Sequence, residues 1–135
     1  MKLTNYTNLD SQSLRSVICA VHTAEGKRRG KRLHTWNKDL TIDVVHSQER
    51  TGERGYSGYA SIHGYFALLR IPHKSIPCNL HIFGGLWRHE LWHLYGIRHK
   101  DFPRSIMWFH ENPPTPFLIK ALSRFDFENI PVKGT

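Results

Sequence analysis

Cysteine, acidic residues and long apolar runs are all scarce in this chain, and each shortage excludes a class of protein. Two cysteines, Cys19 and Cys78, are too few for a disulfide framework, so we expect buried thiols or a single bridge. No apolar run reaches the roughly 18 residues of a membrane span, so none is expected. Eleven scattered acidic residues do not cluster as calcium ligands do, so calcium is not expected either.

The N-terminal residues, MKLTNYTNLDSQS, lack the apolar segment of a secretory signal. We therefore expect a cytoplasmic protein, unless a leader is missing from the sequence.

The charge is strongly one-sided, because 19 basic residues against 11 acidic ones give a formal charge of +8. Such an excess is compatible with acidic substrates, nucleic acid or an anionic surface as partners. It is densest at residues 27–32, KRRGKR, a run typical of a solvated loop. No aromatic residue interrupts this run, and no nucleic-acid-binding module accompanies it.

The length of 135 residues suits one domain, residues 1–135, with a core of its own. Hydrophobic periodicity predicts a strand at residues 2–6, a helix at residues 11–25 that Gly26 and Gly30 close, and a strand at residues 40–46. Residues 58–71 are rich in strand-forming residues and predict a bent strand or a hairpin. This order indicates an α+β fold.

Two further helices are predicted in the second half. One begins between residues 79 and 85, runs to residue 95 and would pack Trp87, Leu91 and Leu94 on the sheet. The other is capped by Thr115 and has Pro116 in its first turn. The tail after about residue 129 is expected to be loose.

Residues 89–99 read HELWHLYGIRH and carry the clearest chemical signal. On a helix, His89 and His93 differ by about 40° in direction and about 6 Å along the axis, so both imidazoles reach one point. A third ligand, His99, requires the chain to leave the helix, and Gly96 stands where a positive φ would end it. Three histidines leave the fourth zinc position open, which is the catalytic arrangement. We predict one catalytic zinc.

Glu90 follows the first of these histidines and lies beside the predicted metal. A carboxylate there can take a proton from a zinc-bound water, whose pKa the metal lowers to about 7, and pass it to a leaving amine. A structural zinc has no use for this carboxylate. Glu90 therefore favours a zinc-dependent metalloendopeptidase.

Met107 follows in the run Ser105-Ile106-Met107, eight residues after His99. Together with the long histidine motif, this run resembles the metzincin metallopeptidases, and most of all the matrixin branch, whose zinc motif precedes a methionine turn. The resemblance covers residues 89–107. It implies that Met107 is an apolar floor beneath the metal and not a ligand. It also implies a metzincin-like catalytic domain with a small twisted mixed sheet, three helices and an active-site cleft.

In such a domain, an edge strand from residues 58–71 would bind a protein or peptide substrate in extended form, and residues 108–114 would wall the specificity pocket. The sequence departs from the matrixin pattern at Lys100 and at Phe109, which cannot donate a hydrogen bond to the site. His63 lies in a context loosely similar to a second, structural zinc site. No His-x-Asp accompanies it, so one zinc is expected. We also expect a monomer.

Two other functions compete with proteolysis. The chain could be a zinc-binding interaction module that cleaves nothing, or a basic nucleic-acid-associated protein. Turnover of a peptide pool separates the first from an enzyme, and salt-dependent DNA binding would favour the second.

Overall fold

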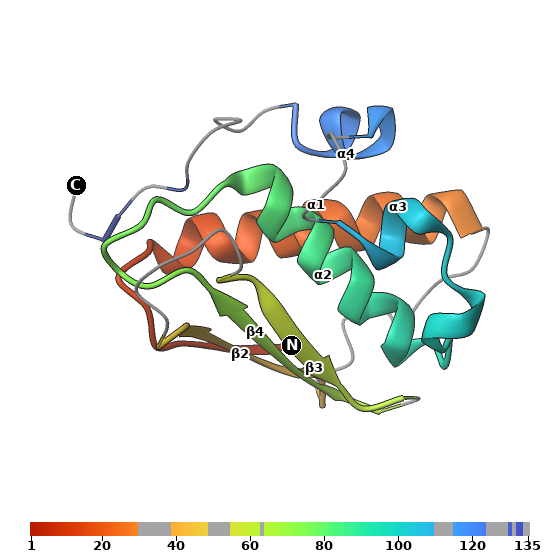
Figure 1. Cartoon of the computed structure of the whole chain (residues 1–135), viewed down its shortest axis with the longest axis horizontal. Coiled ribbons are helices and arrows are strands. Elements are labelled where there is room, and N and C mark those ends of the chain that lie inside the picture. Colours follow the sequence, from red (N-terminus) through yellow and green to blue (C-terminus); the bar gives the residue numbers. More distant parts are fainter. Residues whose placement is uncertain are drawn as a thin grey trace.

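The computed structural model describes residues 1–29, 39–48, 55–62, 64–109, 115–123, 130 and 132–133, and the side chains of all of these except 27–29. They form a mixed α+β fold with one open sheet (Figure 1). In chain order the elements are β1 (Lys2–Asn5), α1 (Ser11–Arg29), β2 (Thr41–His46), β3 (Ser57–Ala60), β4 (Phe66–Ile71), α2 (Leu80–Leu94), the 3₁₀ turn η1 (His99–Asp101), α3 (Arg104–Met107) and α4 (Pro116–Ala121).

The four-stranded sheet has the order β1-β2-β4-β3. The pairs β1–β2 and β2–β4 are parallel, while β3 runs antiparallel to β4 in a hairpin. The expected mixed sheet is confirmed, and residues 58–71 form a hairpin and not a single bent strand. Strand β3 lies at one edge of this sheet, which leaves its outer row of backbone groups without a sheet partner among the described residues.

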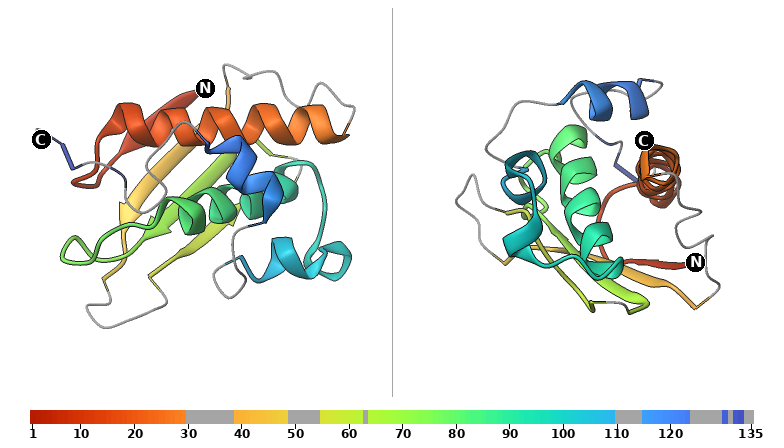
Figure 2. Two further views of the ribbon diagram at one scale, coloured as in Figure 1. Left: turned by 90° about the horizontal axis from the view of Figure 1, so that it is seen from above. Right: turned by 90° about the vertical axis from the view of Figure 1, so that its right-hand side faces the viewer.

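The core lies between the sheet and helices α1 and α2, which cover the same face of it (Figures 1 and 2). Full burial of a large apolar side chain contributes about 1.5–3 kcal/mol. The completely buried side chains come from both layers and include Leu14, Val17, Ile18, Val21, Ile42, Val44, Leu69, Ile71, Phe83, Leu86, Trp87 and Leu91. The hydrophobic periodicity that predicted the first helix is thus confirmed by its buried side chains. Trp87 is completely buried in this core, and its indole N–H also donates to the carbonyl oxygen of Ile18 in α1, at 3.1 Å.

Helix α1 is longer than predicted. Asp10 caps it by accepting a hydrogen bond from the backbone N–H of Ser13 at 2.8 Å, but the helix continues through Gly26 to Arg29. A glycine inside a helix costs about 1 kcal/mol relative to alanine, which tertiary contacts readily offset. Glu25, completely buried against α2, provides such contacts one residue earlier. The basic run therefore begins inside the helix, and its residues 30–32 lie outside the described part.

The described residues contain four α-helices, where three were predicted. The additional one, α3, is a single turn that begins after Pro103 and ends at Met107. Helix α4 lies beyond α1 and α2 on the side away from the sheet (Figure 2), and Thr115 caps it as predicted, at 3.3 Å from the backbone nitrogen of Leu118.

The chain beyond residue 129 is held at several points, although the sequence predicted a loose tail. Ile130 is buried in the core, Val132 forms a β-bridge with Leu9, and Lys133 donates its backbone N–H to Asn8 at 2.8 Å. None of the described helices is long and apolar enough to span a bilayer. His63, which was considered for a second zinc site, lies outside the described residues. So do residues 110–114 of the segment that was expected to wall the specificity pocket.

Candidate metal centre

Helix α2 carries the first two candidate ligands. It begins at Leu80, where the Asn79 side chain accepts a hydrogen bond from the backbone N–H of Ile82 at 3.1 Å. It ends at Leu94, within one residue of the predicted end. His89 is buried on this helix, and His93 is half-buried one turn later.

The helix ends at the predicted glycine. Gly96 has φ of 88°, and this left-handed conformation confirms the role expected for it. The backbone N–H of Gly96 donates to the backbone carbonyl of His93 at 2.8 Å, and that of Ile97 donates to the backbone carbonyl of Trp92 at 3.0 Å. These two bonds are those of a Schellman motif, which reverses the chain after a helix. The reversal brings His99, in η1, back toward the helix.

The three histidines converge as predicted. The Nε2 atom of His99 lies 3.2 Å from that of His89 and 2.9 Å from that of His93. Ligands about 2.05 Å from a tetrahedral zinc are about 3.3 Å apart, so these spacings are close to those that the ion requires. Among the described residues, His89, His93 and His99 are the group able to hold a metal ion.

The other ring nitrogens of two ligands are already engaged. His89 Nδ1 lies 2.9 Å from the carbonyl oxygen of Ile106, and His93 Nδ1 lies 2.9 Å from that of Ile97. Because a carbonyl only accepts, each Nδ1 carries the proton and each Nε2 presents a lone pair to the cluster. Metal-binding histidines are typically oriented in this way. Burial also lowers the pKa of His93, which favours the neutral ring that a metal needs.

Glu90 lies beside this cluster and is not one of its three candidate ligands. Its side chain is buried, with Oε1 at 4.0 Å from His89 Nε2, and Oε2 has no hydrogen-bond partner in the described part of the chain. Burial raises the pKa of this carboxyl to about 8, whereas a bound cation would favour the charged form. Among the described residues, none donates a hydrogen bond to Oε2 of Glu90.

The edge strand β3 comes very close to this carboxylate at Gly58. A Cβ atom on Gly58 would lie only 2.7 Å from Oε1 of Glu90. Only glycine can therefore occupy this position without displacing Glu90. Residues 58 and 90 are far apart in sequence, and no local pattern marks their contact.

Phe102 is a site residue that the sequence reading missed. Its ring centroid lies 4.8 Å from those of His89 and His93, and 5.5 Å from that of His99. It thus packs against all three imidazoles. Met107, expected as their apolar floor, ends α3 and is half-buried, and its place beneath the metal stays a prediction.

The remaining features lie apart from the histidines. Cys19 and Cys78 are free thiols, and burial raises the pKa of Cys78 to about 12.

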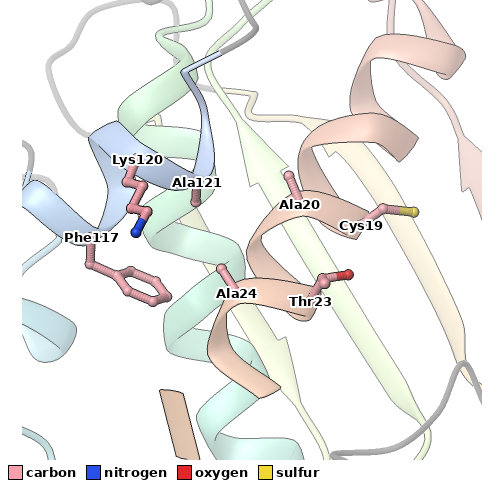
Figure 3. A pocket seen from close by; sticks show the side chains of 7 residues that line it. All are labelled: Cys19, Ala20, Thr23, Ala24, Phe117, Lys120 and Ala121. Atoms are coloured by element: carbon pink, nitrogen blue, oxygen red, sulfur yellow. The ribbon is translucent and has the colours of Figure 1, made fainter. Parts of the chain in front are cut away.

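A cavity of about 450 Å³ lies between α1 and α4 (Figure 3) and is lined by Cys19, Ala20, Thr23, Ala24, Phe117, Lys120 and Ala121. In Figure 3 the side chains of Cys19 and Thr23 point away from α4. The cavity shares no residue with the histidine cluster.

The ring centroid of Phe109 lies 5.7 Å from that of His89. Comparison of the chain with protein-family models, with curated proteins and with solved structures finds no match in any of the three.

Proposed function

We propose that this protein is a zinc-dependent metalloendopeptidase of the metzincin type. One observation carries the proposal: three histidine Nε2 atoms converge beside a buried carboxylate, Glu90, that has an oxygen without a partner. A site built only to hold a metal for structural reasons gains nothing from such a carboxylate, because an unsatisfied buried oxygen costs free energy.

The three histidines and Glu90 would have separate roles in the reaction. His89, His93 and His99 would hold the ion, with two of their rings fixed by the carbonyls of Ile106 and Ile97. A bound zinc would polarise a carbonyl oxygen and lower the pKa of a water molecule to about 7. Glu90 would take the proton from that water and later donate it to the leaving amine.

Strand β3 supports a substrate of extended conformation. Its outer edge has no partner in the described sheet, and its residue Gly58 lies so close to Glu90 that an added Cβ atom would be 2.7 Å from Oε1. A peptide that pairs with this edge in β-conformation would therefore pass close to Glu90. The protein or peptide would be bound by its backbone, which fits a protease better than an enzyme for small molecules.

The decisive experiment is cleavage of a peptide library by zinc-loaded protein, with Glu90→Gln as the matched variant. The proposal expects zinc in both proteins and turnover in the parent alone. Zinc binding without turnover by the parent would instead favour a non-proteolytic zinc module. Salt-dependent DNA binding without zinc would favour the nucleic-acid hypothesis.

A further inference from the structure

The face of α2 next to that of the histidines is attached to α1 by a buried charged pair. Glu25 of α1 is 0% exposed and Arg88 of α2 is 3% exposed, with Oε2 and Nε 3.0 Å apart. The second oxygen of Glu25 accepts a hydrogen bond from the indole N–H of Trp92 at 2.8 Å. Both oxygens of one carboxylate thus bind α2, on residues four positions apart that share one helix face.

Those two positions directly precede the metal ligands. Arg88 comes one residue before His89, and Trp92 comes one residue before His93. A helix held at two successive turns on one face cannot easily rotate about its axis. The direction in which both imidazoles point is therefore coupled to the contacts of Glu25.

A second route leads through side-chain rings. The Trp92 ring meets that of Phe102 edge to face, with centroids 5.6 Å apart and an interplanar angle of 77°. Phe102 in turn contacts the three histidines. Such edge-to-face pairs have preferred geometries, so the placement of Trp92 constrains that of Phe102.

Stability alone is a poor explanation for this charged pair. Removing two charges from water costs several kcal/mol each, and apolar replacements of buried pairs are often neutral or stabilising. Buried polar groups can instead specify one arrangement of packed elements. Here the arrangement specified is that of α2 against α1, and Arg88 extends it to α4 because its guanidinium lies 4.3 Å from the centre of the Phe117 ring.

We propose that Glu25 is a positioning residue of the metal centre, which holds the histidines in metal-binding geometry through Arg88, Trp92 and Phe102. The inference rests on the proposed metal site. It concerns the precision of that site and not the chemistry carried out there.

Two tryptophans of α2 offer a matched test. Trp92 and Trp87 each donate one indole hydrogen bond to α1, to Glu25 and to the backbone of Ile18 respectively. Only Trp92 is linked to Phe102 by the contacts above. Trp92→Phe and Trp87→Phe each remove one such bond and keep an aromatic ring.

The measurements are zinc affinity by competition with a chelator and the visible absorption spectrum of the Co²⁺-loaded protein, which reports ligand geometry. We expect Trp92→Phe to bind Zn²⁺ about 10–100-fold more weakly and to change the Co²⁺ spectrum, as losses of outer-shell contacts do. Trp87→Phe should bind both metals like the parent, even where it lowers the melting temperature. Glu25→Gln should act in the same direction as Trp92→Phe, because a neutral amide cannot compensate the charge of Arg88.

The outcomes separate the two proposals. A parent protein that binds neither ion overturns the metal centre itself. A parent that binds, with Trp92→Phe matching its affinity and spectrum, overturns the role of Glu25 alone. Equal changes in Trp92→Phe and Trp87→Phe would also overturn it, because they would reflect general loosening of the helix pair. If Glu25→Gln fails to fold, the zinc affinity and Co²⁺ spectrum of Trp92→Phe alone test the positioning role of Glu25.

Discussion

Glu25 of α1 and Glu90 of α2 are both almost inaccessible to solvent, with exposed fractions of 0% and 3%. Glu25 binds Arg88 and Trp92 through its two oxygens. Glu90 has no hydrogen bond to Oε2, and burial raises its pKa to about 8. Two equally buried glutamates thus differ in their hydrogen bonds. Both oxygens of Glu25 have partners, whereas Oε2 of Glu90, which lies beside the histidines, has none among the described residues. Burial alone is therefore a weaker indication of a functional carboxylate than burial without hydrogen-bond partners.

The largest expected difference between the two glutamates is in folding. Glu25→Ala should lower the free energy of unfolding by about 3–5 kcal/mol, because it removes the buried carboxylate that forms an ion pair with Arg88 and accepts the hydrogen bond of Trp92. Glu90→Ala should change it far less, since it removes a carboxylate that the protein does not satisfy. Denaturant unfolding of both variants in the presence of a chelator measures this. Equal losses of stability would show that the two carboxylates are not used differently.

The second difference is in catalysis. Glu90→Gln should keep the fold and the zinc content and lose about 10²–10⁴-fold in kcat, which is the usual contribution of a general base. Steady-state cleavage and elemental analysis of the same samples test this. Comparable rates in variant and parent would remove Glu90 from the mechanism.

A smaller effect is expected from the neighbour of Glu90 in β3. Gly58→Ala places a Cβ 2.7 Å from Oε1 of Glu90 and must displace the carboxylate. We expect kcat to fall by up to about 10²-fold at unchanged zinc content, because misplacement by about 1 Å can cost that much. The double variant with Glu90→Gln should lose nothing beyond Glu90→Gln alone. Independent, multiplying losses would mean that Gly58 acts elsewhere.

The smallest effect is expected from a substitution of Met107, which tests the surroundings of the three histidines beside Glu90. If Met107 is an apolar floor, Met107→Leu nearly preserves its volume and should cost less than about 1.5 kcal/mol in stability, with zinc affinity unchanged. Thermal unfolding with and without chelator tests this. A large loss of zinc affinity in Met107→Leu would show that the sulfur atom itself matters.

Local patterns predicted much of this molecule. Helical spacing placed His89 and His93 together, and the helix end at Gly96 followed from the freedom of glycine at positive φ. The hydrophobic alternation of residues 40–46 found β2 within one residue. In each case the determining interactions lie within about one turn or one strand of the residue concerned.

The missed features depend on contacts between residues far apart in the chain. Glu25 and Arg88 are 63 residues apart in sequence, so no local pattern predicts their ion pair. The helix that carries Glu25, α1, continues past Gly26, where the sequence predicted its end. Gly58 begins the segment 58–71 that was predicted as strand or hairpin, and nothing in that pattern indicates its closeness to Glu90. Phe102 follows the motif closely in sequence, but its contact with all three imidazoles requires the path through η1. The metzincin assignment itself remains a proposal, because it depends on the motif of residues 89–107.

The bonds from His89 to Ile106 and from His93 to Ile97 have a thermodynamic consequence. They connect the end of α2 to the segment that follows it, so an ion bound by the histidines would hold that whole segment in its native form. Binding to the folded chain alone adds RT ln(1 + [Zn²⁺]/Kd), or about 2.7 kcal/mol when free zinc is 100 times Kd. Such an increment is a large part of the total stability of a small domain. The melting temperature would then depend on the free zinc concentration as well as on the sequence, and zinc supply would control how much of the chain is folded.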